Sequence, residues 1–289
     1  MTDLPNEPSL RGTRGLRDRL GDQTLKSVAF TAALLGLITV VAIAVEVLRQ
    51  SKGAFDRFGL GFIVHSGWDV THSVFGARDW IYGTLVTGAG ALLVGTPLAV
   101  AIALYLSELA PRGLRTVVGA LVELLAAIPS VVLGLFGIIV LGPLVKDYAY
   151  PALSGPLGFI PLFHEVGNVN GSNIMTAVVV LTIMVVPIIA SVTLEVLTAV
   201  PNDLKEGALA LGATRWEMIR GVMLPTAKPG IVAAVILGFG RAVGEAIAVT
   251  QVIGGANRIH YWSLFETGDT LASKIAAQFQ NTENALQAS

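Results

Sequence analysis

NDLKEGALALGATRWEMIRGVMLP, residues 202–225, is the longest polar interval with positive charge inside it that lies between two strongly apolar stretches of this chain. It contains two capping-box patterns, in which a short polar side chain is followed three residues later by a glutamate. They are Asp203 with Glu206 and Thr214 with Glu217. Each pattern marks the start of a helix, so the stretch predicts two short helices in succession.

The ends of these two helices are also marked. Gly212 lies between them, and glycine suits the residue that ends one helix and turns the chain into the next. The Leu224-Pro225 pair predicts the end of the second helix, because proline has no backbone N–H and crowds the preceding turn. Two short helices held between apolar stretches indicate a docking element, which we call the knuckle (residues 202–225).

The composition around the knuckle is that of an integral membrane protein. Of 289 residues, 53% are hydrophobic and only 13% are charged, whereas about a quarter would be charged in a soluble protein. The 32 glycines suit helices that pack closely in a bilayer. A net charge of -1 argues against nucleic-acid binding, which needs a basic face. The absence of cysteine excludes disulfides and thiolate chemistry.

Five apolar runs are long enough to cross a bilayer, which takes about 20 residues of helix. They lie at about 28–48, 81–106, 117–145, 173–198 and 229–254. We therefore predict an all-α membrane protein with a basic cytoplasmic tail over residues 1–26. Residues 27–289 would form the transmembrane domain, with the knuckle in a loop over 199–228. Residues 274–289 are too polar to form another span.

The distribution of Lys and Arg predicts the orientation of these spans. If the N-terminus is cytoplasmic, the cytoplasmic intervals hold eleven of these residues and the outer intervals hold seven. The excess favours this orientation, because cytoplasmic loops are enriched in Lys and Arg. Aromatic residues, which gather at membrane interfaces, cluster at the proposed outer ends: Trp80, Tyr82, Tyr148, Tyr150, Tyr261 and Trp262. The knuckle is then cytoplasmic.

Two intervals between spans are predicted to be irregular. Residues 49–80 hold His65 and His72, which lack a suitable carboxylate partner and indicate a solvated loop rather than a metal site. Residues 146–172 are rich in proline and glycine and predict an exposed, irregular loop.

Arg241 and Glu245 are the strongest candidates for functional residues. Arg241 lies about 18 Å along the fifth predicted span, near the middle of the membrane. Glu245 follows four residues later, on the same face of a helix, so the two can pair. Charges at this depth are costly and usually functional. Arg241 could release Glu245 and bind a tetrahedral oxyanion; alternatively, the pair only orients the helix.

Pro129-Ser130 interrupts the third predicted span. Proline frees a backbone carbonyl there, and broken helices often mark the substrate path in transporters. A plain packing kink is the equal alternative. The glycines of the second span indicate a close-packing face rather than a site: Gly83, Gly88, Gly90 and Gly95.

Several functions are disfavoured by what the sequence lacks. No GxxxxGK[ST] pattern occurs, so the chain should not bind ATP through a P-loop. No Ser/His/Asp arrangement or HExxH pattern occurs either. We expect no catalytic residue, metal or cofactor in this chain.

The knuckle resembles the EAA loop of ABC importer permeases. That pattern has a glutamate followed by small residues, a glycine six positions after the glutamate, and an aliphatic-x-Leu-Pro ending. The matching residues are Glu206, Gly207, Ala208, Gly212, Val222, Leu224 and Pro225, with Gly207 in place of the usual first alanine. The resemblance implies that these residues and the intervening Arg215 form coupling helices that dock in a groove of an ATPase subunit.

Three further stretches resemble the PstC family of phosphate-specific permeases. They are IYGTLVTGAGALLVGTPLAVAIALYLSELAP (81–111), ELLAAIPSVVLGLFG (123–137) and GFGRAVGEAIAVTQVIGG (238–255). The resemblance implies a type I ABC importer fold in a bacterial inner or plasma membrane, with Arg241 and Glu245 tied to phosphate passage. The implied partners are a dimer of PstB-like ATPases that binds ATP and Mg²⁺, a PstA-like second permease and an external PstS-like phosphate-binding protein.

The sequence leaves other substrates and other functions open as alternatives. Family members normally end with a sixth span, which this sequence is expected to lack. Phosphate is favoured over molybdate or sulfate only by the stretches 123–137 and 238–255. A membrane scaffold or sensor that binds a cytoplasmic regulator through the knuckle is a further possibility. A secondary carrier is disfavoured by the knuckle and by the lack of inverted repeats.

Overall fold

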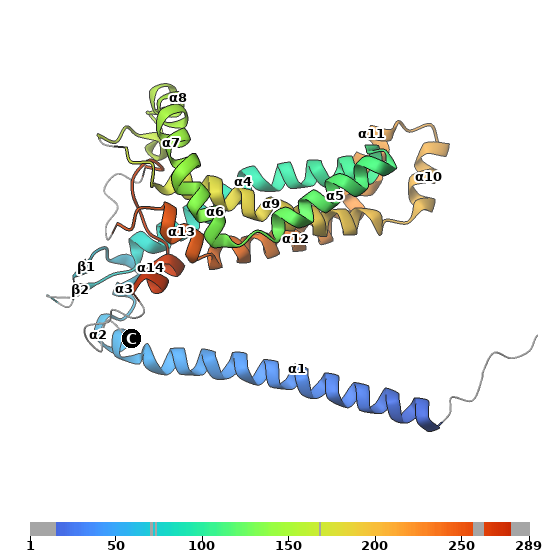
Figure 1. Cartoon of the computed structure of the whole chain (residues 1–289), viewed down its shortest axis with the longest axis horizontal. Coiled ribbons are helices and arrows are strands. Elements are labelled where there is room, and N and C mark those ends of the chain that lie inside the picture. The colour runs from blue at the N-terminus through green and yellow to red at the C-terminus, as the bar shows by residue number, and fades with distance from the viewer. Residues whose placement is uncertain (1–15, 70–71, 73, 168, 257–262, 279–289) are drawn as a thin grey trace, which may run out of the picture. The chain divides into compact units, whose positions relative to one another are not determined.

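The computed structural model describes residues 16–69, 72, 74–167, 169–256 and 263–278 (Figure 1). Within these residues the fold is all-α apart from one small hairpin. The helices are α1 (Leu16–Gln50), α2 (Lys52–Phe58), α3 (Gly61–Val64), α4 (Arg78–Leu104), α5 (Arg112–Ala126), α6 (Ser130–Phe136), α7 (Gly142–Leu144), α8 (Tyr150–Leu157), α9 (Ile174–Thr198), α10 (Asn202–Ala210), α11 (Arg215–Met218), α12 (Leu224–Gly244), α13 (Ile247–Val252) and α14 (Leu271–Gln278).

Some of these helices continue into π-helical segments, and a separate 3₁₀ turn follows α8. The π-helical segments are Tyr105–Leu109, Gly137–Leu141, Val145–Ala149 and Ile219–Met223, and a 3₁₀ turn covers Pro161–Phe163. The antiparallel hairpin pairs β1 (Trp68–Asp69) with β2 (Val74–Phe75). The described residues form two compact units, one up to Arg57 and one from Phe58 onward.

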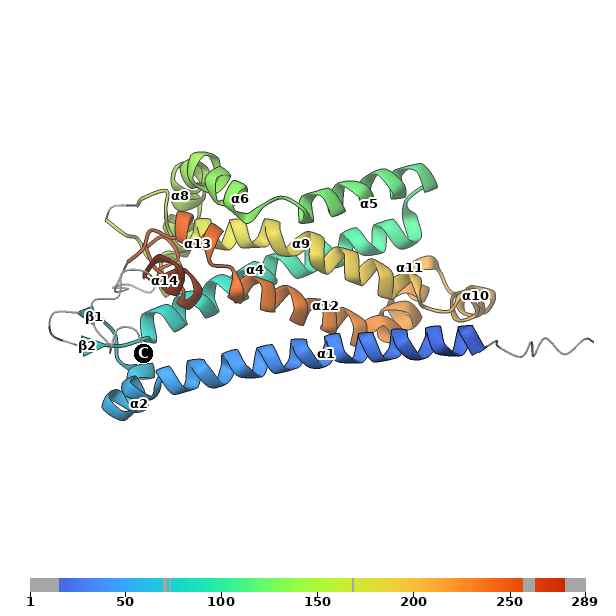
Figure 2. The same ribbon diagram turned by 60° about the horizontal axis from the view of Figure 1, so that its bottom comes forward.

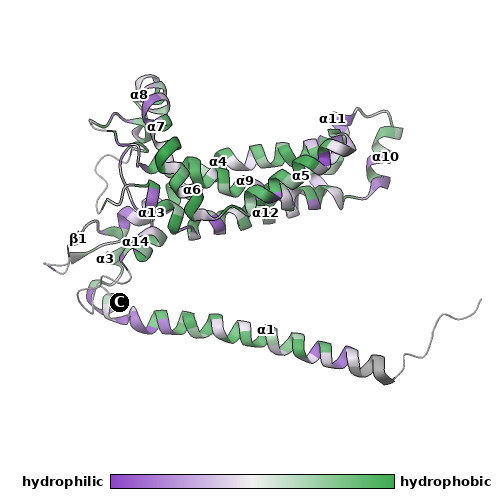
Figure 3. Ribbon diagram, viewed as in Figure 1, coloured by the Kyte–Doolittle hydropathy of each residue, from purple (hydrophilic) through white to green (hydrophobic). Residues whose placement is uncertain are grey.

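The first unit consists mainly of α1. Its side chains from Gly21 onward are exposed, including large apolar ones around the whole helix. Figure 3 shows these apolar residues in green along its length. A helix that is apolar on every side suits a lipid environment, and residues 21–50 are long and apolar enough to cross a membrane.

The second unit is built around α9. Of the apolar window of α9, 61% is buried, against 28% for α4 and 22% for the run that ends in α12. Helices α4, α9 and α12 pack side by side in both views (Figures 1 and 2). Helix α9 contributes more residues to the main core than any other helix does, including Ile174, Leu181, Val185 and Ile189. The prediction of an all-α membrane fold with five spans is confirmed for the described residues.

Glycines bring α4 close to its neighbours, as predicted. A Cβ on Gly90 would lie 3.1 Å from the Val178 side chain, and one on Gly95 would lie 3.0 Å from Val185. On another face, a Cβ on Gly88 would lie 3.2 Å from the Phe239 ring. Small residues at these positions therefore allow α4 to contact both α9 and α12.

The third apolar run folds differently from the prediction of one span over 117–145. Its first part is the separate helix α5, and residues 127–129 break the chain before α6 begins at Ser130. The long apolar helical run is 130–157. The prediction of an irregular loop over 146–172 is thus wrong for residues up to Leu157, because Pro151 lies in the first turn of α8, where a missing N–H is tolerated.

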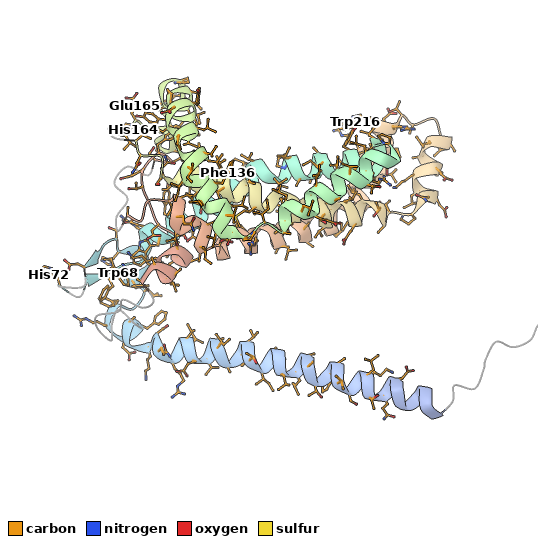
Figure 4. All side chains as sticks on the ribbon, in the orientation of Figure 1. Trp68, His72, Phe136, His164, Glu165 and Trp216 are labelled. Carbon is orange, nitrogen blue, oxygen red and sulfur yellow. The ribbon has the colours of Figure 1, made fainter. Side chains whose placement is uncertain are left out.

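The interval 49–80 is more ordered than the predicted solvated loop. It contains α2, α3 and the hairpin, and the Trp68 ring lies 4.6 Å from the Trp80 ring and 4.4 Å from the Phe75 ring. The expectation that His72 lacks a carboxylate partner is wrong, because its Nδ1 atom lies 2.7 Å from the Asp69 Oδ2 atom; the His72 side chain is exposed (Figure 4). No group of three or more possible metal-binding residues occurs in the described part of the chain.

The knuckle has one of its two predicted capping boxes. At Thr214, the side chain accepts from the Glu217 N–H, and the Glu217 carboxylate accepts from the Thr214 N–H at 2.8 Å. Gly212 has a φ of +88°, which confirms it as the turn between α10 and α11. The capping box predicted at Asp203 does not form. Helix α10 begins at Asn202, directly after Pro201, so Asp203 lies within its first turn.

Pro225 does not end the second knuckle helix. The chain runs as helix without a break from Arg215 to Gly244. The segment just before Pro225 is π-helical, Ile219–Met223, and Pro225 itself occupies the first turn of α12. The wider π-helical turn directly before Pro225 lets the helix pass the proline, whose ring would otherwise crowd the preceding turn. The knuckle is therefore continuous with the fifth span.

The segment that follows α13 returns to α4. The Leu271 N–H donates to the Thr84 hydroxyl at 3.0 Å, and a Cβ on Gly83 would overlap the Asp269 carbonyl. Burial raises the pKa of the Asp269 carboxyl and lowers the pKa of the Lys274 ammonium group. This return segment (263–278) fixes α4 against α14 at the end of the bundle remote from the knuckle.

Candidate functional site

A break between α12 and α13 forms the centre of the candidate site. The fifth predicted span, 229–254, is not one helix: α12 ends at Gly244 and α13 begins at Ile247. Glu245 has an extended ψ of 111°. Its carboxylate accepts a hydrogen bond from the Ala248 N–H at 3.2 Å. Glu245 thus caps the first turn of α13 and stabilises the break.

Arg241 and Glu245 form the predicted ion pair across this break. The Arg241 Nη2 atom lies 3.2 Å from the Glu245 Oε2 atom. The Glu245 side chain is only 6% exposed, whereas the Arg241 side chain is 47% exposed. Arg241 lies in the last turn of α12, and Glu245 follows the end of α12 and precedes α13. Each charge therefore faces the helix end whose dipole favours it.

In this arrangement the Arg241 guanidinium group is about half exposed and can bind a further group. Arginine has five N–H donors in a planar fork, and Glu245 contacts Nη2 from one side. The half-exposed remainder of the group can donate two parallel hydrogen bonds to an oxyanion. Because Glu245 also binds the backbone of Ala248, it can stay in place while the arginine turns toward an anion.

Pro129 and Ser130 lie at the second helix break. Pro129 has an extended ψ of 136°, and Ser130 is the first residue of α6. The Pro129 carbonyl accepts from the N–H groups of Val132 and Leu133 at 3.0 and 3.3 Å. The interruption predicted from sequence is confirmed as a full break, in which the helix restarts rather than bends.

The structure brings the two breaks together through α6 and α13. A Cβ on Gly134 would lie 3.0 Å from the Ala248 Cα atom and 2.5 Å from the Gln251 Oε1 atom. Ala248 is the residue whose N–H binds Glu245. Neither Ala248 nor Gln251 was identified from the sequence, because a small residue and a lone amide carry no pattern. Gly134 of α6 therefore packs against the residue whose N–H binds Glu245.

Adding a single methyl group at Gly137 should loosen this contact. A Cβ there would lie 2.5 Å from Val252 and 2.9 Å from Val180, both stiff β-branched side chains. We expect Gly137→Ala to lower the free energy of unfolding by about 1–3 kcal/mol, as overpacking does. Thermal unfolding of the purified chain in detergent measures the change.

The control for that substitution is Gly119→Ala in α5. Apart from Gly119, its chain neighbours and the backbone of its own helix, no atom of the described residues lies within 4 Å of a Cβ at this position. The same change should therefore be neutral or stabilising there, because alanine favours helix over glycine by about 1 kcal/mol. Equal unfolding temperatures for the two variants would show that the α6–α13 contact is not tight.

The candidate coupling residues lie at the other end of α12. Glu206, Gly207 and Ala208 are on α10, and Arg215 is the first residue of α11. Leu224 and Pro225 begin α12. The 17 residues from Leu224 to Arg241 span about 26 Å of helix. One helix thus connects the knuckle to the ion pair.

The surface of the knuckle is apolar in places where a soluble surface would be polar. Leu211 is 91% exposed and Trp216 is 64% exposed, and Figure 4 shows Trp216 at this end of the bundle. Leu204 and Leu209 are exposed as well. A group of large exposed apolar side chains marks an interaction surface, so the knuckle is suited to bind a partner protein.

Comparison with known proteins identifies relatives over nearly the whole chain. The family described as binding-protein-dependent transport system inner membrane component matches residues 95–267. The phosphate transport system permease protein PstC of Xylella fastidiosa (strain Temecula1) is 40% identical over 280 residues, covering 96% of this chain and 86% of the relative. The protein of the same name from Mesorhizobium japonicum is 37% identical over 294 residues, covering 99% and 88%.

A solved structure shares the fold. It is a bacterial ABC transporter involved in the import of the acidic polysaccharide alginate, and it aligns with a TM-score of 0.56 at 19% identity. The alignment covers 93% of this chain and 90% of that chain.

Proposed function

This chain belongs to the binding-protein-dependent transport system inner membrane components, in the branch of the PstC phosphate permeases, and we propose that it forms one membrane-spanning subunit of an ATP-driven phosphate importer. Its fold is that of a type I ABC importer transmembrane domain, as predicted. The chain is a multi-pass membrane protein and a transport subunit.

The observation that supports phosphate is the Arg241–Glu245 pair. Inorganic phosphate is a tetrahedral oxyanion, and a half-exposed guanidinium fork matches two of its oxygens. A buried carboxylate holds that guanidinium at a helix break. Phosphate can thus compete with Glu245 for Arg241, and the anion leaves when the carboxylate closes on the arginine again. Pro129 and Ser130 would line the same path from the neighbouring break.

The proposed orientation places the N-terminus and the knuckle in the cytoplasm. The excess of Lys and Arg on that side supports it. The return segment and the hairpin β1–β2 would then face outward, together with the Tyr148 and Tyr150 side chains. An external phosphate-binding protein of the PstS type would deliver the anion to that outer face.

Two copies of a PstB-like ATPase and one PstA-like permease would complete the importer. The sequence contains no P-loop, so ATP and Mg²⁺ would bind to the ATPase subunits and this chain would need no cofactor. The exposed Leu211 and Trp216 of the knuckle would fill a groove of one ATPase. Closure of the ATPase dimer would then move the knuckle and rock the helices around the pathway.

Purification of the assembled complex from a membrane tests this proposal. We expect an ATPase to co-purify with this chain, and reconstituted vesicles to take up labelled phosphate only when ATP and the external binding protein are both supplied. Phosphate uptake without ATP would contradict the proposal, as would purification of the chain with a regulator in place of an ATPase.

A further inference from the structure

An ion pair between the knuckle and the second span provides an additional connection. The Lys205 Nζ atom on α10 lies 2.8 Å from the Glu108 Oε1 atom. The two residues are 97 positions apart. Glu108 lies in the π-helical segment Tyr105–Leu109 that ends the second span. The pair joins the first knuckle helix directly to the end of the α4 run.

The burial of this pair sets it apart from ordinary surface contacts. The side chains of Lys205 and Glu108 are 13% and 18% exposed. None of the nine residues of α10 is buried as a whole. From α10, Ala208 packs against the apolar cluster at the knuckle end of the bundle, which includes Leu197, Met218 and Met223. Screening by water and salt weakens exposed pairs, whereas this sheltered pair keeps more of its attraction.

The segment that carries Glu108 is held firmly on its other side. The Arg115 guanidinium of α5 donates to the carbonyls of Leu106 and Ser107, which precede Glu108. Leu106 itself is buried. Because the acceptor segment is fixed in this way, a movement of Lys205 would pull on the whole end of the α4 run rather than on a loose turn.

The N-terminal half of α4 contacts the turn of α12 that carries Arg241. A Cβ on Gly88 would lie 3.2 Å from the Phe239 ring and 3.4 Å from Val243. These two residues flank Arg241 on α12. A shift of α4 along α12 therefore changes the packing on both sides of the arginine. The knuckle thus has two routes to the ion pair, one through Gly212 and α12 and one through Glu108 and α4.

We propose that Lys205 and Glu108 are positioning residues that make α10 and α4 move together, so that α4 acts as a second lever on Arg241. This inference rests on the proposed transport function. The pair transmits movement and touches no substrate. Its loss should lower the amount of phosphate imported per ATP hydrolysed while leaving the ATPase bound, because the apolar docking residues of the knuckle are unchanged.

Charge exchange in the assembled complex tests the proposal. Lys205→Glu and Glu108→Lys alone should each lower the ratio of phosphate imported to ATP hydrolysed by roughly fivefold or more, as loss of a coupling contact does. The double variant Lys205→Glu with Glu108→Lys restores the opposite charges and should recover most of the ratio. Lys52→Glu, at an exposed lysine of α2 outside the apolar spans, serves as the matched charge control.

A double variant no better than the single ones would overturn the proposal and indicate that Lys205 acts on the ATPase directly. If a single variant fails to assemble, crosslinking decides instead. The chain contains no cysteine, so Lys205→Cys with Glu108→Cys can be joined by a short bis-thiol reagent. The joined complex should keep its ratio, and loss of uptake on joining would overturn the proposal. Absence of uptake by the unmodified complex would instead refute the transport function.

Discussion

Replacing Arg241 by alanine in the assembled complex should reduce phosphate uptake at least about a hundredfold. Two charge-assisted hydrogen bonds to the anion would be lost, each worth about 1.5–3 kcal/mol. Glu245, only 6% exposed, would also lose its positive partner, which adds a penalty for a buried charge. Initial rates of labelled phosphate uptake into reconstituted vesicles measure the effect.

The substitutions of Glu245 separate its two contacts. Glu245→Gln keeps an oxygen that can accept from the Ala248 N–H but removes the charge that holds Arg241, so the chain should fold normally and transport poorly. Glu245→Ala removes the helix cap as well and should also lower the unfolding temperature. Wild-type uptake by both Arg241→Ala and Glu245→Gln would show that the pair lies outside the pathway.

The variant Gly212→Val should separate the knuckle from its ATPase. Gly212 has a φ of +88°, a conformation that a β-branched residue adopts only at a cost of about 1–3 kcal/mol. No atom of the described residues lies within 4 Å of a Cβ there, so the cost falls on the α10–α11 turn alone. The angle between these helices should change, and the amount of ATPase that co-purifies should fall about tenfold or more.

Gly212→Asn is the matched control for this prediction. Asparagine enters the left-handed region more readily than valine, and the site has room for its side chain. It should retain much more ATPase than the valine variant does. Equal ATPase content in both variants and in the unmodified complex would contradict the role of this turn in docking.

The sequence alone predicted the fold class, the number of apolar spans and one of the two capping boxes of the knuckle, whereas the predicted bounds of the third and fifth spans were wrong. Hydropathy identified the spans because lipid contact demands long apolar runs, and the Thr214–Glu217 capping box was recognisable because its two partners are three residues apart. The Arg241–Glu245 pair was found for the same reason, since its spacing is local. Both partners of each pair lie within four residues of one another, so the pattern is visible in the sequence.

The remaining features depend on contacts that a linear pattern does not encode. The continuity of the helix through Pro225 requires the π-helical turn before it, and the break at Glu245 is stabilised by a bond to Ala248. The Asp203 pattern did not form a capping box because α10 begins earlier, after Pro201. The pair between Lys205 and Glu108 joins residues 97 positions apart, and only the folded chain brings them together.

Competition between anions during uptake tests the central claim most directly. Vesicles that contain the complete complex would be supplied with labelled phosphate at its half-saturating concentration, ATP, the binding protein and a tenfold excess of unlabelled sulfate, molybdate or phosphate. If this chain forms a phosphate pathway at Arg241, only unlabelled phosphate should suppress the uptake of label. Suppression by sulfate or molybdate to the same degree, together with ATP-driven uptake of that anion when it carries the label, would contradict it.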